Sequence, residues 1–190
     1  MSFMLLGILN SQAAGAGGGG FVHIGTVDAN NATQAVFTGL SGYTNYYVIC
    51  APSDKSYDYS SSQSYNNLQI QFNGDTAYNY QRAHYAYRSG SGRSVYANNN
   101  ESEYNLAGVL SGDSGSGNIG SPNQIWIQNS TDRWKMIMAN TFQPRCSNDS
   151  GGLWTKGIWE NNSEITSILF KSGSGQQFRK TKFYLYGTAV

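Results

Sequence analysis

The sequence predicts an all-β fold, an antiparallel β-sandwich, and three observations lead to that expectation. The 190 residues include 14 Tyr and 23 Gly, while charged residues make up only 12%, a composition unlike that of helical proteins, which are rich in Glu, Lys, Leu and Ala. Short apolar stretches alternate with polar residues at the period of two that strands require. Clusters of Gly, Ser and Asn separate these stretches at the short intervals typical of turns.

The first expected strands lie in the N-terminal half of the chain. Residues 35–38 lead through a Gly-containing turn to an aromatic run at residues 43–50. Residues 68–72 alternate strictly and end in the pair Asn73 and Gly74. Because Asn-Gly accepts positive φ at both turn positions, it predicts a hairpin to the next strand, at residues 78–88.

The later strands follow the same pattern. Residues 125–127 and 134–138 flank a polar turn and are expected to form an antiparallel pair. The chain closes with further short strands at residues 157–159, 165–170 and 182–187. Segments of this length, separated by turns, are those of a two-sheet, jelly-roll-like sandwich, and 190 residues suffice for one such domain.

Residues 1–13 form an apolar N-terminal segment that differs from the rest of the chain. The run lacks a basic start and is about half as long as a membrane span, so it predicts neither a signal peptide nor membrane insertion. We expect an attachment segment that is buried against sister subunits or a docking partner. Residues 14–20 are Gly-rich and predict a flexible hinge, which leaves residues 21–190 as the β-sandwich domain. The apolar side chains of the attachment segment are Phe3, Met4, Leu5, Leu6, Ile8 and Leu9.

The charge of the chain argues against a nucleic-acid partner. The formal net charge is +1 at pH 7, so no basic field is available to hold a phosphate backbone. The weak electrostatic repulsion between copies of such a chain instead suits a subunit of an assembly. No Gly-rich phosphate loop with its Lys-Ser/Thr partner occurs, and we expect no cofactor.

Neither a catalytic site nor a metal site is predicted. His23 and His84 have no second ligand at a suitable offset, and we expect both to be ordinary strand residues. The Asp-Ser-Gly stretches around Ser114 and Ser150 lack the surroundings of a catalytic serine. A hydrolase of surface polysaccharides, the remaining enzymatic alternative, needs two carboxyl groups across a cleft. Its candidates are Glu101, Glu103, Asp113, Glu160 and Glu164, of which the first two lie in a polar stretch expected to be a solvated loop.

The candidate contact residues are Tyr side chains set among Ser and Asn. Tyr57, Tyr59 and Tyr65 lie in a stretch too polar for a core strand, where aromatic faces and amides suit a sugar or a protein partner. Of the two cysteines, Cys50 lies in an apolar strand and is expected to be buried. Cys146 lies in a polar stretch, and its thiol is the candidate for an intermolecular disulfide.

Motifs at both ends of the chain and within its body carry a resemblance. They are FMLLGILNSQAAG at residues 3–15, FTGLSGY at 37–43, LQIQFNGDT at 68–76, the segment 153–159 with EITSI at 164–168, and FYLYG at 183–187. Together they resemble small virion proteins of tailed bacteriophages, including phages of cyanobacteria, over nearly the whole chain. The match at residues 3–15 is the most specific of them.

The resemblance implies a structural protein of the virion, made in the host bacterial cytoplasm, and not an enzyme. Related domains serve as tail-fibre modules or as capsid decoration (cement) proteins, usually jelly-roll-like and often trimeric. We therefore expect a short tail fibre that is attached to the baseplate or tail and contacts the host surface. A capsid decoration protein is the alternative, and a surface-polysaccharide hydrolase ranks third. The expected partners are further copies of the chain in a homotrimer, other virion proteins, and host-surface glycans.

Overall fold

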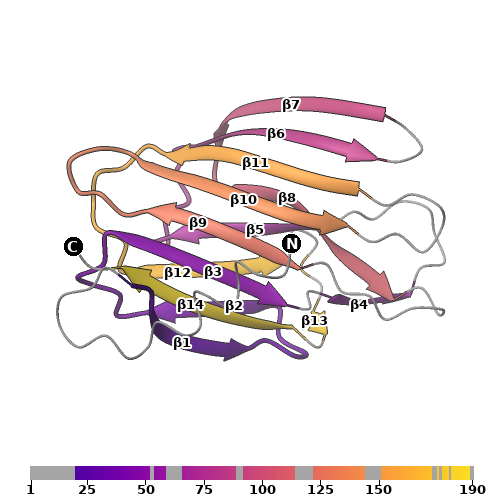
Figure 1. The fold of residues 1–190 in the computed structure, drawn as a ribbon, viewed down its shortest axis with the longest axis horizontal. Helices are drawn as coiled ribbons and strands as arrows, with labels where there is room; N and C mark the ends of the chain where they lie inside the picture. The colour runs from indigo at the N-terminus through magenta and orange to yellow at the C-terminus, as the bar shows by residue number, and fades with distance from the viewer. Residues whose placement is uncertain are drawn as a thin grey trace.

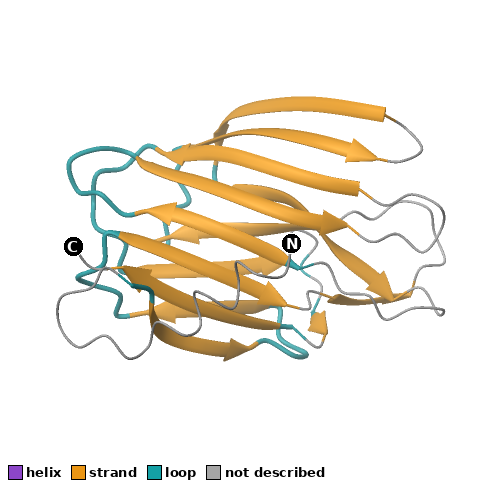
Figure 2. Ribbon diagram, viewed as in Figure 1, coloured by secondary structure: helices purple, strands orange, loops and turns teal. Residues whose placement is uncertain are grey.

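The computed structural model of this protein describes residues 20–51, 54–58, 66–88, 92–113, 122–143, 151–172, 175, 177–179 and 181–188. All regular structure in these residues is β: an eight-stranded and a six-stranded sheet pack face to face (Figure 1, Figure 2). The predicted all-β sandwich is therefore confirmed. The predicted attachment segment at residues 1–13 and the hinge at residues 14–20 lie outside the described residues, apart from Gly20.

The larger sheet has eight strands, and every neighbouring pair in it is antiparallel. Its central strands come from the aromatic run and the Trp-containing segments that the sequence singles out. From one edge to the other the order is β1 (Val22–Asp28), β14 (Lys182–Thr188), β3 (Asn45–Ala51), β9 (Asn123–Gln128), β10 (Lys135–Gln143), β11 (Gly151–Trp159), β6 (Tyr80–Arg88) and β7 (Gly92–Glu101).

The smaller sheet has six strands and lies behind the larger one in the view of Figure 1. Its order is β13 (Phe178–Arg179), β4 (Asp54–Asp58), β8 (Tyr104–Asp113), β5 (Asn66–Phe72), β12 (Ser167–Ser172) and β2 (Gln34–Thr38). The pair β4 and β8 is parallel, and the other neighbours are antiparallel. Because the larger sheet has more strands, it extends beyond the smaller one at β7 (Figure 1).

The apolar core lies between the sheets because alternate residues of each strand point inward. In β10, Ile137 and Ala139 are buried, while Met138 between them is exposed. Phe170 of β12 joins the two layers: its ring stacks on Phe183 of β14 with the centroids 4.7 Å apart. The same ring meets Phe37 of β2 edge-on, with the centroids 6.3 Å apart. The burial of such rings is the main contribution that holds the two sheets together.

The turn after β5 differs from the hairpin that the sequence predicts. Asn73 and Gly74 do have positive φ angles, 54° and 67°. However, β5 pairs with β8 and β12 in the smaller sheet, whereas β6 pairs with β11 and β7 in the larger one. The predicted hairpin between residues 68–72 and 78–88 is therefore wrong, because the chain crosses from one sheet to the other at residues 73–79. Asn-Gly determines local backbone angles and not the partner of the next strand.

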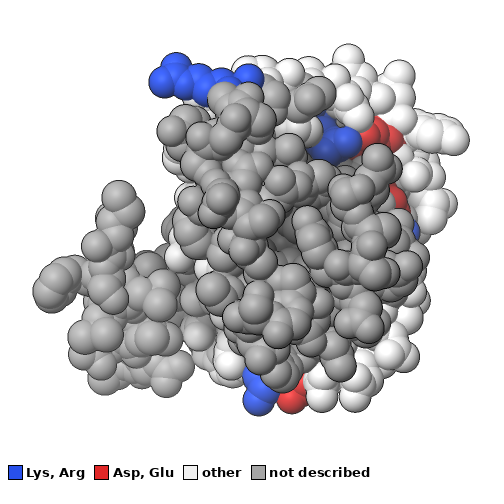
Figure 3. Space-filling model, turned by 90° about the vertical axis from the view of Figure 1, so that its right-hand side faces the viewer, with Lys and Arg blue, Asp and Glu red and all other residues white. Residues whose placement is uncertain are grey.

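Charged side chains are sparse on the described surface. In the view of Figure 3 both signs occur as small, separated groups among uncharged side chains. Lys182 and Asp28 form an exposed ion pair across β14 and β1, with Nζ and Oδ2 3.5 Å apart. Exposed pairs of this kind contribute about 0–1 kcal/mol to stability. The described part of this side thus presents no extended patch of a single sign.

Gly157 of β11 is a point of close approach between the sheets. A Cβ atom at this position would lie 2.2 Å from Cε2 of Tyr104 in β8 and 2.2 Å from the carbonyl oxygen of Gln81 in β6. Both distances are well below van der Waals contact. The fully buried Tyr104 ring therefore occupies the space that a side chain at residue 157 would need.

The substitution Gly157→Ala is expected to destabilise the fold by about 1–3 kcal/mol, the usual range for overpacking a core. Urea unfolding followed by Trp fluorescence measures the loss. Gly152→Ala in the same strand is the matched control, because nothing lies within 4 Å of a Cβ atom there, and it should leave the unfolding midpoint nearly unchanged. Equal midpoints for Gly157→Ala and the wild-type protein would contradict this packing.

Candidate functional site

The larger sheet has one side that faces away from the second sheet, and this side carries large apolar side chains. In β10, Met136 and Met138 are 46% and 39% exposed. Trp154 of β11 is 52% exposed, and Val95 of β7 is 71% exposed. Exposed apolar side chains gathered in one area indicate a contact surface. We call this surface the outer face and define it by Trp126, Met136, Met138, Trp154, Tyr85 and Val95.

The outer face consists of two cross-strand rows, which meet at β10 and β11 beside exposed polar residues: Met138 lies opposite Lys156, and Trp154 lies opposite Asn140. Trp126 of β9 lies opposite Met138 of β10. Trp154 of β11 lies opposite Tyr85 of β6, which in turn lies opposite Val95 of β7. The Trp154 and Tyr85 rings stack, with their centroids 5.7 Å apart. Such pairs stabilise the sheet and at the same time leave a row of apolar surface in contact with solvent.

The contacts of Phe21 show from which side of the larger sheet the chain enters β1. Its ring lies 5.7 Å from that of Tyr47 and 5.2 Å from that of Trp126, centroid to centroid. Tyr47 and Trp126 are cross-strand partners in β3 and β9, and both point to the outer side of the sheet. Phe21 therefore lies on the outer face, and the chain enters β1 from that side.

At one end of the sandwich, four turns are linked to one another by asparagine side chains. These are the turns at residues 39–44, 73–79, 129–134 and 160–166, teal at the left of Figure 2. Asn129, which is 4% exposed, donates to the Tyr43 carbonyl oxygen at 2.8 Å and accepts from the Ile165 amide at 2.9 Å. Asn73 Oδ1 accepts from the amides of Thr166 at 2.8 Å and Ser167 at 3.0 Å. We call this region the loop end.

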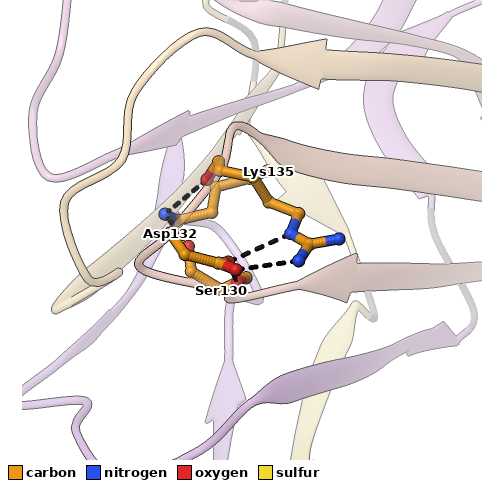
Figure 4. Close-up of polar contacts among 4 residues, drawn as sticks. Ser130, Asp132 and Lys135 are labelled. Carbon is orange, nitrogen blue, oxygen red and sulfur yellow. Dashed lines mark hydrogen bonds and ion pairs between the residues drawn. The ribbon is translucent and has the colours of Figure 1, made fainter.

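Lys135 holds the turn at residues 129–134 from inside the sandwich (Figure 4). The residue is fully buried at the start of β10, and Nζ donates to the carbonyl oxygens of Ser130 and Arg133. Burial lowers the pKa of the Lys135 amine, and the nearby charge of Asp132 opposes that effect. The bonded carbonyl oxygens fix the backbone on both sides of Asp132, so the turn is ordered by a buried group although its tip is exposed.

At the tip of this turn, Asp132 and Arg133 form a two-point ion pair. Arg133 Nε donates to Asp132 Oδ1 at 3.0 Å, and Arg133 Nη2 donates to Oδ2 at 2.8 Å. The Ser130 hydroxyl also donates to Oδ1 (Figure 4). The hydrogen bonds from Arg133 and then from Ser130 hold the pKa of Asp132 well below its usual range. The carboxylate is therefore ionised at neutral pH.

An open pocket of about 400 Å³ lies beside this ion pair. It is lined by Asp132, Arg133, Trp134 and Asn162, and we call it the loop pocket. Trp134 is 51% exposed and immediately precedes β10. It is in phase with Met136 and Met138, so its side chain belongs to the same side of the sheet as the outer face. The apolar outer face and the loop pocket are therefore adjacent along β10.

Most residues that the sequence analysis proposed for contact lie outside the described residues. This holds for Phe3, Met4, Leu5, Leu6, Ile8, Leu9, Tyr59, Tyr65 and Cys146, and for the side chain of Tyr57, whose backbone is part of β4. Cys50 is fully buried in β3, as its strand context predicts.

Trp134, Trp154 and the methionines of β10 were not identified from the sequence as contact residues. The alternation at residues 134–138 separates Trp134, Met136 and Met138 from Lys135 and Ile137, and this was the available signal. It does not say which set is buried, because the buried set contains a lysine.

Glu101 and Glu103 do not lie in the solvated loop that the sequence predicts. Glu101 ends β7, is 17% exposed, and forms an ion pair with Arg82 in which Nε and Oε2 are 2.8 Å apart. Glu103, in the turn before β8, forms an ion pair with Lys171 of β12. The expectation of a solvated loop is wrong because cations on neighbouring strands hold both carboxylates at the sheet.

The other carboxylates considered for a hydrolase lie at the loop end or at the end of β8. Glu160 accepts a hydrogen bond from Gln81, and Glu164 Oε1 accepts one from the Gly42 amide at 2.9 Å. Both contacts connect the turn at residues 160–166 to neighbouring segments. Asp113 ends β8, and its side chain lies outside the described ones.

The two histidines lie on strands. His23 of β1 is exposed, with Nε2 3.0 Å from Thr26 Oγ1. His84 of β6 is half-buried; burial lowers its pKa, the charge of Arg82 adds to that effect, and the charge of Glu101 opposes it. Among the residues that the structure describes, no group of three or more His, Cys, Asp or Glu side chains is placed to hold a metal ion. The same residues contain no helix of the length and apolar character that a membrane crossing requires.

Comparison with known proteins gives no match: no protein-family model, no curated protein and no solved structure is similar to this chain. The resemblance to virion proteins of tailed phages therefore remains a prediction from the sequence motifs. The surfaces of the described sandwich that carry exposed aromatic side chains are the apolar outer face and the loop pocket beside it.

Asp75 is a half-buried acceptor at the loop end. Its Oδ2 accepts from the Trp159 indole at 2.7 Å and from the Asn79 amide side chain at 2.9 Å, while Oδ1 accepts from the Ala77 backbone amide at 2.9 Å. Burial alone would raise the pKa of Asp75, but the donors Asn79, Trp159 and Ala77 together outweigh burial and lower it below 3.8. The fully buried Trp159 indole thus depends on an ionised partner.

The stability contributed by Asp75 should be lost in acid. Because the folded-state pKa is lower than the unfolded-state value of 3.8, the contribution is present above pH 3.8 and disappears as the pH falls through the folded pKa. We expect Asp75→Asn to reduce stability by about 1–3 kcal/mol at pH 6 and to show a smaller further loss on acidification to pH 3. Urea unfolding across this range measures both effects.

The exposed Asp28 provides the control for loss of one carboxylate. Its side chain is 57% exposed, so Asp28→Asn should change stability by less than about 1 kcal/mol at either pH. If Asp75→Asn and wild-type protein lost equal stability between pH 6 and pH 3, the assigned role of Asp75 would be refuted.

Proposed function

We propose that this chain is a non-catalytic structural protein of a tailed-phage virion, a short tail fibre attached to the baseplate or tail that contacts the host surface. The observation that carries the proposal is the outer face, where two cross-strand rows place exposed or half-buried Trp, Met, Tyr and Val side chains on one side of a β-sandwich. The sequence motifs that resemble phage virion proteins supply the biological setting.

The outer face has the chemistry of a lasting protein contact. Its exposed members include Met136, Met138 and Trp154, and Met and aromatic residues are enriched at the centres of protein interfaces. Covering apolar surface contributes about 25 cal/mol per Å² of area removed from water. We assign this surface to sister subunits of a homotrimer and to neighbouring virion proteins.

The position of Phe21 indicates which side of the sandwich faces the virion in the proposed fibre. Since Phe21 lies on the outer face, the chain that leads to the apolar residues 1–13 starts from the side that we assign to the virion. The loop end projects from one end of the strands, beyond the outer face (Figure 2). In the proposed arrangement the outer face and the N-terminal segment serve assembly, and the loop end is available to the host.

A capsid decoration protein is the second candidate. The outer face crosses most of the larger sheet, and a broad apolar face of this kind also suits attachment to a shell of repeated subunits. The two candidates differ in where the chain is located on the particle, and in whether the chain has to contact the host surface.

Antibody labelling of purified particles, combined with electron microscopy, tests the location. The fibre predicts label at the tail or baseplate, in a copy number that fits threefold groups. Label on the head alone would reject the fibre in favour of decoration. Absence of the chain from purified particles, judged by mass spectrometry, would overturn both.

The double substitution Met138→Glu with Trp154→Glu should turn the assembled protein into a monomer, because it places charges in an apolar contact. Analytical ultracentrifugation of the full chain measures the mass. Val36→Glu is the matched control, since Val36 is 44% exposed on the outside of the smaller sheet and should leave the oligomer intact. A wild-type protein that is monomeric at tens of micromolar, or a double variant that still assembles, would refute this use of the outer face.

A further inference from the structure

The loop pocket joins an aromatic side chain to a charged pair at an exposed site. Trp134 is 51% exposed, and the side chains of Asp132 and Arg133 are each 64% exposed. Asn162, from the turn after β11, completes the lining. The hollow is wide open to solvent, so a ligand there would lie against its surface without being enclosed.

Two buried side chains, Lys135 and Asn129, hold the backbone of the turn that carries the exposed pocket residues. The fully buried Lys135 donates to the carbonyl oxygens of Ser130 and Arg133, on either side of Asp132. Asn129 fixes the start of the same turn through its bonds to Tyr43 and Ile165. A site held in this way loses little conformational freedom when it binds a ligand.

The ion pair offers hydrogen-bond donors and acceptors side by side. Arg133 uses Nε and Nη2 on the Asp132 carboxylate, which leaves its other N–H groups for a ligand. Asp132 accepts these two bonds and one from Ser130, and its oxygens retain acceptor capacity. A hydroxyl group donates and accepts at once, so two neighbouring hydroxyls match this pair. An anionic ligand only accepts, and it would face the charge of Asp132.

We propose that the loop pocket binds a neutral pyranose sugar, with the sugar ring stacked on Trp134 and two neighbouring hydroxyl groups hydrogen-bonded to the Asp132–Arg133 pair. The apolar C–H face of a pyranose suits an indole ring, and the planar ion pair fixes the orientation of the sugar. The inference rests on the proposed function in that a host-surface glycan supplies the sugar. It adds a sugar site at the loop end to the contact residues Tyr57, Tyr59 and Tyr65 that the sequence predicts.

Two-dimensional NMR of the full chain, titrated with the methyl glycosides of glucose, galactose and mannose, tests the proposal. The Trp134 indole N–H signal should shift saturably with at least one of them, with a Kd on the order of 1 mM, as expected for one ring on an open site. Trp154 is the internal reference: it is 52% exposed in the single chain, lies on the outer face away from the loop pocket, and should not shift. Equal shifts at both indoles would mean nonspecific stacking and would overturn the proposal.

Trp134→Ala, in which binding is followed through the backbone amide signals of Asp132, Arg133 and Asn162, should weaken binding at least about tenfold, the effect expected for loss of an aromatic platform. Tyr78→Ala is the matched control: Tyr78 is 72% exposed and is not among the pocket residues, so binding should be unchanged. Unchanged affinity in Trp134→Ala, or equal loss in both variants, would overturn the assignment.

The charge of the ligand is tested with methyl glucuronide, an anionic pyranoside. The wild-type protein should bind it more weakly than the neutral glycosides. Asp132→Asn removes the repelling charge beside Arg133, and it should weaken neutral sugars while strengthening the glucuronide. A wild-type preference for the glucuronide, or no shift with any neutral glycoside, would overturn the inference. Because particle labelling is independent of sugar binding, either proposal can fail while the other stands.

Discussion

The side-chain amide of Asn129 connects the two sheets at the loop end. It donates to the carbonyl oxygen of Tyr43, just before β3 of the larger sheet, and accepts from the amide of Ile165, just before β12 of the smaller one. Because Asn129 is almost fully buried, loss of either bond would leave a polar group unsatisfied, which costs about 1–3 kcal/mol. The turn at residues 129–134, and with it the loop pocket, depends on this connection.

The two surfaces of interest differ in chemistry because they arise from different parts of the same strand. Along β10, outward residues such as Met136 and Met138 form an apolar face, which suits contact that excludes water. At the start of β10, the buried Lys135 and the exposed Asp132–Arg133 pair make a polar site that suits a reversible ligand. One strand thereby supports an assembly surface and a recognition site that can act together on a particle.

Most of the fold could be predicted from the sequence, since alternation and turn composition are local properties. The strands at β2, β3, β5, β9, β10 and β14 follow directly from them. The pairing could not be predicted: Asn73 and Gly74 adopt the expected φ, yet β5 and β6 belong to different sheets. For a similar reason, the exposure of Trp134 could not be predicted. Alternation separates the two faces of β10, but it does not say which face the other sheet covers. Burial is decided by contacts between distant segments.

A cryo-EM map of the intact particle, at a resolution that places the sandwich, tests the central claim most directly. We predict that the outer face, with Trp154 and Met138, is covered by sister subunits or virion proteins, and that the loop end with Trp134 extends past the covered area and stays exposed to solvent. A map in which the outer face is exposed to solvent and the loop end is buried against the virion would contradict it.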